Sequence, residues 1–215
     1  EVAGALSAEE FQEALDRMGS GLEVSVGPEA SSLRLSTLTR NAAASFRLMD
    51  LALRSPRFDP DAFARVKRLR LGALDQALDD PDAVVRRTGM QAFFGPGHPY
   101  ARPADGLKAD VETLSLQDAK GFWKERYGPR GSTLLVAGDL PAADLDRLLA
   151  ETLGLWEGRG AKAPSPIGPA PARPAGRRLL LVDRPGAPQT SVCFFWGGPR
   201  RQDPDRAALR VLNTV

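Results

Sequence analysis

The sequence has 215 residues, of which 42% are hydrophobic and 26% charged, proportions that are ordinary for a globular protein. Its 29 basic and 27 acidic residues leave a net charge of +2, which argues against a nucleic-acid or anionic-membrane partner. A single cysteine, Cys193, excludes an internal disulfide, and no uninterrupted apolar run is long enough to span a bilayer.

Helix-start signals divide most of the chain into helices. Ser7, followed three residues later by Glu10, is a capping box, and Asp59-Pro60 and Asp80-Pro81 each place a capping carboxylate before a proline at the first helical position. Together with the glycine and proline residues that end helices, these signals predict helices over residues 8–18, 41–54, 59–78, 80–94, 115–127, 141–153 and from 203 onward.

Period-two alternation predicts the strands. Residues 22–26 and 32–38 form a hairpin with one face in a core, and residues 132–139, 177–185 and 190–198 are three further strands. Runs of helices beside a hairpin and further strands favour an α+β class. The expected architecture is a two-layer sandwich of helices on a mixed, largely antiparallel sheet, and not a doubly wound sheet.

The composition changes after Glu157. Residues 158–176 are mostly Pro, Ala, Gly and Arg with almost nothing to bury, so we predict a semi-extended linker. Residues 1–157 then form one α+β domain, and residues 177–215 are the truncated start of a second, because the last helix stops without a cap or a breaker. An incomplete second sheet predicts exposed apolar surface around residues 190–196 and some self-association.

The only histidine, His98, lies in a "GPGHPY" turn. A zinc site needs three or four ligands, and one histidine and one cysteine far apart leave that shell incomplete. We therefore expect His98 to bond a backbone carbonyl. Cys193 lies in an apolar run, which predicts a buried, inert thiol. Nucleophilic catalysis needs a base and an orienting group, but His98 is the only imidazole and no G-x-S-x-G elbow precedes a helix.

Other kinds of site are weakly supported. Acid–base chemistry by paired carboxylates stays open, although Asp59, Asp80 and Asp118 are placed as helix caps. The glycine-containing strand-to-helix turns carry neither G-x-G-x-x-G nor a P-loop pattern.

The most basic segment, residues 65–78, also has a structural interpretation. Its apolar positions Val66, Leu69, Ala73 and Leu74 fall on one helical stripe that should face the core. The basic residues are therefore the solvated face of an ordinary helix, and nucleic-acid binding would need interleaved aromatic residues and a larger basic surplus.

Four stretches together resemble the pitrilysin/insulinase-like zinc metallopeptidases, particularly their bacterial, mitochondrial-processing-peptidase-like branch. They are "GALSAEEFQEALDRMGSGLEVSV", "LRSPRFDPDAFARVKRL", "GHPYARPADGLKADVETLSLQDAKGFWKERYGPRGSTLLVAGDL" and "RPGAPQTSVCFFWGGPRRQDPDRAALRVLNTV". Each is a weak motif alone, but their order and spacing resemble the family along nearly the whole chain. The last stretch resembles the start of a second homologous domain.

The resemblance implies where a zinc site would lie. The family's ligands come from an H-x-x-E-H helix, which would fall just before residue 1, and from a distal Glu on the helix after Asp59-Pro60. At the distal positions this sequence has Gly72 and Ala73, and Val66 stands where the family places another carboxylate. His98 matches the family's HPY turn, which is not a ligand. We therefore assign no catalytic, metal-binding or cofactor-binding residue to this chain.

The resemblance implies a noncatalytic half, or subunit, of an insulinase-like zinc metalloendopeptidase that helps to enclose and bind unfolded peptides. Its partner is a catalytic half, in the same chain or a separate subunit, and that half holds the zinc. A structural or assembly subunit without proteolysis is the alternative. A third reading is an active half whose H-x-x-E-H lies upstream of residue 1. The expected location is the bacterial cytoplasm or periplasm.

Overall fold

The computed structural model describes residues 6–157, 160, 176, 178–199 and 202–214. It divides into two compact units, unit 1 with Glu1–Leu74 and Ala104–Pro166, and unit 2 with Asp75–Pro103 and Ile167–Val215. Apart from Gly160 and Gly176, the predicted linker lies outside the described residues. The division into residues 1–157, 158–176 and 177–215 stays a prediction.

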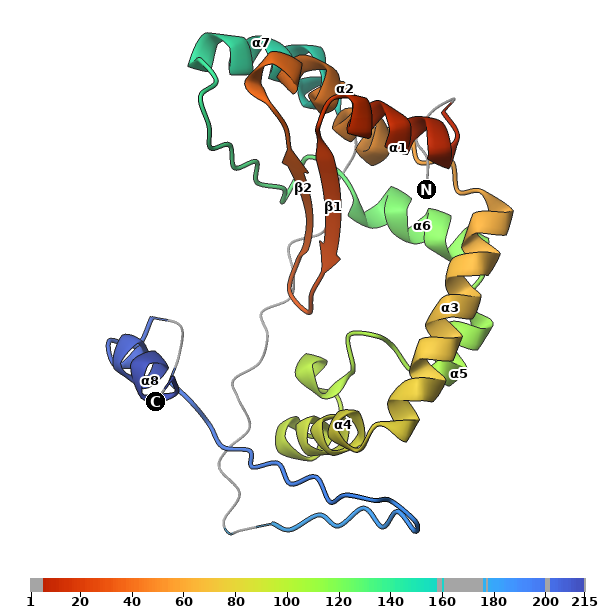
Figure 1. Ribbon diagram of the computed structural model, residues 1–215, viewed down its shortest axis with the longest axis vertical. Coiled ribbons are helices and arrows are strands. Elements are labelled where there is room, and N and C mark those ends of the chain that lie inside the picture. The colour runs from red at the N-terminus through yellow and green to blue at the C-terminus, as the bar shows by residue number, and fades with distance from the viewer. Residues whose placement is uncertain (1–5, 158–159, 161–175, 177, 200–201, 215) are drawn as a thin grey trace. The chain divides into compact units, whose positions relative to one another are not determined.

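Helices make up most of unit 1, whereas unit 2 combines helices with extended segments (Figure 1). All seven predicted helices are present within about two or three residues of their expected bounds, and a short helix at residues 108–113 was not predicted. The α-helices are α1 (Ala8–Arg17), α2 (Ala42–Arg54), α3 (Pro60–Asp79), α4 (Pro81–Phe94), α5 (Lys108–Thr113), α6 (Leu116–Arg126), α7 (Ala142–Glu151) and α8 (Arg206–Leu212). Short 3-10 turns are η1 (Thr39–Asn41), η2 (Pro99–Ala101) and η3 (Leu153–Leu155).

One antiparallel hairpin is the only sheet in the part of the chain that the structure describes. Strand β1 (Gly21–Val26) pairs with β2 (Ser31–Ser36) in a register that sets Leu22 opposite Leu35 and Val24 opposite Leu33. The burial predicted for one hairpin face holds only near the helices, because Leu22 is half-buried while Val24 is 69% exposed.

The core of unit 1 is built on one face of α2. Ala42, Ser45, Phe46 and Met49 are buried at spacings of three, one and three, which place all four side chains on one side of the helix. Buried side chains of α1 and α7 complete this core: Leu15 and Leu148. Helix α7 lies beside α2 in Figure 1, where Arg47 pairs with Glu151 at 3.3 Å.

The other predicted strands are extended but unpaired. Residues 132–137, 178–184 and 190–198 are not strands, which corrects their prediction. A strand is defined by a hydrogen-bonded neighbour, and within the described ranges β1 and β2 pair only with each other. Leu135 is 88% exposed as a result. Alternation in a sequence therefore identifies extended backbone, whereas pairing depends on which segments meet.

The cap of α6 makes this helix sensitive to acid. The Ser115 backbone N–H and hydroxyl donate to Asp118 Oδ2 over 2.8 and 2.6 Å, and the Asp118 N–H donates back to Ser115 Oγ over 3.2 Å. The hydrogen bonds from the Ser115 side chain and backbone hold the pKa of Asp118 below its usual value of 3.8.

Because the pKa is lower in the folded state, the stabilisation of α6 is complete above the usual pKa. It is lost as the pH falls through the folded-state value. We expect a carboxyl-carbon NMR titration to place the pKa of Asp118 below 3.8, and the Ser115→Ala variant, which removes the hydroxyl donor, to raise it. An unchanged Asp118 pKa in Ser115→Ala would contradict this cause.

Candidate functional site

Helix α3 carries the positions at which the family resemblance places zinc-binding carboxylates. Val66 is 48% exposed and Leu69 is 64% exposed, while Gly72 has no atom near the place where a side chain would begin. Ala73 is exposed as well. The prediction that the stripe of Val66, Leu69, Ala73 and Leu74 faces the core is therefore wrong for the first three, and Leu74 alone is half-buried. This stripe is an accessible apolar face of α3.

Polar contacts made by other residues of α3 accompany this orientation. The Lys67 ammonium donates to the carbonyl oxygens of Glu112 and Leu114, both at 2.8 Å, at the end of α5. Arg70 pairs with Asp105 at 2.6 Å. Cations at a helix C-terminus satisfy carbonyls that have no partner within the helix. The basic residues were predicted to be a solvated face, but Lys67 and Arg70 attach α3 to the segment around α5.

His98 is held in an aromatic turn. Its Nδ1 accepts a hydrogen bond from the Tyr100 N–H over 3.2 Å, so the side chain caps η2. The ring stacks on Phe94 with centroids 4.7 Å apart and an interplanar angle of 22°. The predicted bond to a backbone carbonyl is wrong, because Pro99 lacks an N–H and the turn offers the N–H of Tyr100 to the ring nitrogen. An accepting Nδ1 places the hydrogen of the neutral ring on Nε2, which is buried and has no partner among the described residues.

Cys193 is exposed, so the expectation of a buried thiol is also wrong. Its segment is extended and unpaired, which leaves the thiol without the covering sheet that the apolar run predicts. The described residues contain no group of three or more His, Cys, Asp or Glu side chains arranged to hold a metal.

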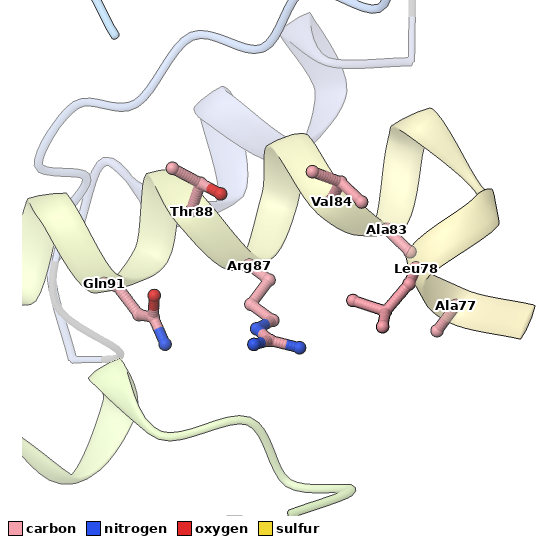
Figure 2. A pocket seen from close by; sticks show the side chains of 7 residues that line it. All are labelled: Ala77, Leu78, Ala83, Val84, Arg87, Thr88 and Gln91. Atoms are coloured by element: carbon pink, nitrogen blue, oxygen red, sulfur yellow. The ribbon is translucent and has the colours of Figure 1, made fainter. Parts of the chain in front are cut away.

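Unit 2 has an open pocket of about 170 Å³ where the end of α3 meets α4 (Figure 2). Its lining residues are Ala77, Leu78, Ala83, Val84, Arg87, Thr88 and Gln91. Arg87 and Gln91 project from α4, and Leu78 from α3 (Figure 2). The volume is below the roughly 300–1,000 Å³ of small-molecule sites, and the lining holds no carboxylate, imidazole or thiol. The pocket therefore offers no acid–base pair and no metal ligands.

Comparison with known proteins places these features in a family. The model of the peptidase M16 inactive domain matches residues 113–215. The chain is similar to proteins of the peptidase M16 family. An uncharacterized zinc protease of Mycobacterium tuberculosis is 27% identical over 214 residues, which is 97% of this chain and 47% of that protein. A non-peptidase homolog of Helicobacter pylori is 27% identical over 135 residues, 63% of this chain and 31% of that protein.

Solved structures share the fold of this chain. A peptidase M16 inactive domain from Pseudomonas fluorescens has a TM-score of 0.71 at 19% identity, covering 76% of this chain and 40% of that one. Pitrilysin has a TM-score of 0.63 at 18% identity, covering 76% of this chain and 18% of that one. The chain spans about half the length of the curated relatives that it matches.

These findings confirm three predictions for the chain. The family resemblance is confirmed, the α+β class is confirmed by the likeness to M16 inactive-domain structures, and the noncatalytic assignment agrees with the matched inactive-domain model. Among the described residues, no helix combines the length and apolarity that a membrane crossing requires. The absence of any assigned catalytic, metal or cofactor-binding residue stays a prediction.

Proposed function

We propose that this M16 domain pairs with a catalytic M16 half and helps to enclose and hold unfolded peptides that the catalytic half cleaves. The catalytic half supplies the zinc ion and the general base. This chain forms part of the wall that encloses the peptide, and it contacts the peptide. The matched inactive-domain model and the relatives named zinc proteases, each about twice as long, support such a division of labour.

The observation that carries the proposal is the chemistry of the α3 face. Zinc binds nitrogen, sulfur and oxygen ligands, and Val66, Gly72 and Ala73 offer none of these in their side chains. In the family that the sequence resembles, these helix positions supply the carboxylate that completes the zinc coordination. The apolar stripe can contact a neighbouring element, but it cannot contribute to a zinc site.

The partner half belongs either to the same parent chain or to a separate subunit, and we place the assembly in the bacterial cytoplasm or periplasm. The identity of the peptide is set by the chamber that the two halves form together. The proposal requires only that this domain presents surface to an extended peptide and does not itself activate water.

Zinc analysis tests the proposal directly. The 215-residue chain, incubated with zinc and desalted, is expected to retain well below about 0.1 equivalent, because three or four ligands cannot be assembled. Its complex with an H-x-x-E-H-bearing M16 half is expected to retain about one zinc and to cleave an unfolded fluorogenic peptide until a chelator removes the metal.

The His98→Ala variant is the matched control, since it removes the only imidazole of the chain. We expect it to leave both the zinc content and the cleavage by the complex unchanged. One tightly held zinc on the isolated chain that disappears in His98→Ala would overturn the proposal. Zinc retained by a protein extended upstream of Glu1, without any partner, would favour the reading in which this half is itself active.

A second candidate function is a structural or assembly role without proteolysis. The similarity to a non-peptidase homolog of Helicobacter pylori favours it. The same reconstitution separates the two. A stable complex that contains no zinc and leaves the unfolded peptide intact supports the structural role, whereas chelator-sensitive cleavage supports the proposed one.

A further inference from the structure

Met18 lies where three elements of unit 1 meet. It follows the last residue of α1, and its backbone N–H donates to the Leu15 carbonyl over 3.1 Å. Its own carbonyl accepts from the side-chain amide of Asn41 over 2.7 Å and from the Ser20 hydroxyl over 3.4 Å. Asn41 immediately precedes α2, and Ser20 immediately precedes β1. Met18 therefore joins the end of α1 to the starts of α2 and the hairpin.

The sulfur of Met18 lies beside a buried hydroxyl. Ser45 donates to the Met18 Sδ atom over 3.7 Å, and Ser45 is 0% exposed. The same hydroxyl is 2.8 Å from that of Ser20 and 2.9 Å from that of Thr37. Each hydroxyl donates one hydrogen and has two lone pairs, so Ser20 and Thr37 can both donate to Ser45 while Ser45 donates to Met18. A thioether sulfur is a weak acceptor, and the reduced side chain therefore uses this donor only weakly.

The other two methionines lack such a donor. Met49 is 5% exposed in the core of unit 1, and Met90 is half-buried on α4. Among the residues that the structure describes, neither of these sulfurs accepts a hydrogen bond. Met18 is half-buried as well. Of the three, it is the one that combines partial access to solvent with a polar partner for its sulfur.

The separation between the Ser45 hydroxyl and the Met18 sulfur suits a sulfoxide. A sulfoxide oxygen lies about 1.5 Å from its sulfur, and an O–H···O hydrogen bond spans about 2.7 Å. With an angle of about 120° at the sulfoxide oxygen, these two lengths place the hydroxyl oxygen about 3.7 Å from the sulfur. The observed separation is 3.7 Å. Ser45 can therefore bond a sulfoxide oxygen without a movement of α1 or α2, and the rotatable bonds of methionine let the sulfur present that oxygen.

We propose that Met18 is a site of reversible oxidation by hydrogen peroxide, and that the Ser45 hydroxyl holds the oxygen of the resulting sulfoxide. A lone pair of the sulfur attacks one peroxide oxygen, so the S–O bond forms as the O–O bond breaks. The proton of the transferred oxygen goes to the departing hydroxide, which leaves as water. Sulfur loses two electrons and the peroxide gains them. A methionine sulfoxide reductase reverses the change with electrons from a thiol.

The bonded oxygen is expected to keep the oxidised chain folded. A sulfoxide turns an apolar side chain into a polar one, and a buried polar group without a partner destabilises a fold. Ser45 removes that cost at Met18, whereas a sulfoxide at Met49 would lie in the core without a donor. The junction of α1, α2 and the hairpin can therefore take up an oxidant without unfolding. This inference does not depend on the role of the chain in proteolysis.

Peroxide treatment of the Cys193→Ser/Met90→Leu chain tests the proposal, because these changes remove the exposed thiol and the other half-buried methionine. Peptide mass spectrometry is expected to find the sulfoxide at Met18 at least about tenfold faster than at Met49, since oxidation follows exposure. The urea midpoint should move little on oxidation. Adding Ser45→Ala should make the loss of midpoint on oxidation at least about threefold larger, because the sulfoxide oxygen then has no donor.

Thr37→Val in the same background is the matched control, since it removes a hydroxyl of the same cluster that makes no hydrogen bond to the sulfur. Its midpoint should change on oxidation as little as that of the parent background. Met18→Leu should take up no oxygen at that position. The two kinds of methionine sulfoxide reductase, one for each epimer, should together restore the original mass and midpoint.

NMR of the chain labelled with methyl-13C methionine gives a second readout that needs no change at Ser45. The Met18 methyl resonance should move to the sulfoxide range and stay dispersed, as in a folded chain. Three results would overturn the proposal: Met18 stays reduced in the folded chain at a peroxide concentration that oxidises the urea-unfolded chain; oxidation at Met18 unfolds the chain; or oxidation lowers the midpoint equally with and without the Ser45 hydroxyl.

Discussion

Replacing Phe46 with alanine is expected to lower the free energy of unfolding by about 3–5 kcal/mol, the usual cost of removing a buried phenylalanine. Phe46 is 7% exposed and lies between Ala42 and Met49 on the buried face of α2. The loss combines the transfer free energy of the ring with the cavity that the helices cannot close. Urea unfolding followed by tryptophan fluorescence measures it, because Trp123 donates to the Leu53 carbonyl at the end of α2 over 3.1 Å.

The neighbouring residue provides the control. Arg47 has a side chain that is 62% exposed and forms only a surface ion pair with Glu151. Such pairs contribute about 0–1 kcal/mol, so Arg47→Ala should change the midpoint little. Comparable losses for Phe46→Ala and Arg47→Ala would contradict the placement of the core on the Phe46 side of α2.

A buried hydroxyl cluster should produce the second large effect. The Ser45 hydroxyl is 2.8 Å from the Ser20 hydroxyl and 2.9 Å from that of Thr37, and those two are 2.8 Å apart. Ser45 is 0% exposed, so water cannot replace a lost partner. Ser45→Val is expected to lower the free energy of unfolding by about 1–3 kcal/mol, the cost of leaving buried polar groups with fewer partners.

A double-mutant comparison isolates that cost. Ser20→Ala and Ser45→Ala should each destabilise the fold, and together they should cost less than the sum of the two. In each single variant the remaining serine hydroxyl loses its partner, whereas the double variant contains neither hydroxyl. If the two losses of unfolding free energy add strictly in urea unfolding, the hydroxyls are not coupled, and each serine contributes only through its own packing.

The helices and the family could be predicted from the sequence. Ser7 with Glu10 and Ser115 with Asp118 form the reciprocal caps that their spacing predicts, and Asp80 caps α4 ahead of Pro81. A cap depends on residues three or four positions apart, so its signal is complete within a short stretch of sequence. The family resemblance, too, rests on motifs whose order along the chain needs no structure.

For the candidate site, the sequence predicted which residue types are present, but not the direction in which they point. Val66, Gly72 and Ala73 show from sequence alone that α3 has no zinc ligand at the expected positions. The direction in which this face points was predicted wrongly. The basic residues Lys67 and Arg70 bind carbonyls and Asp105 some forty residues away, and that long-range attachment turned the apolar stripe outward.

Two other outcomes were decided by tertiary structure. Cys193 is exposed, and residues 132–137 are extended without becoming a strand. Capping and helix formation are local, so the sequence by itself determined them. The burial of a face, the pairing of a strand and the partner of a side chain depend on segments distant in sequence, and only the folded chain brings those segments together.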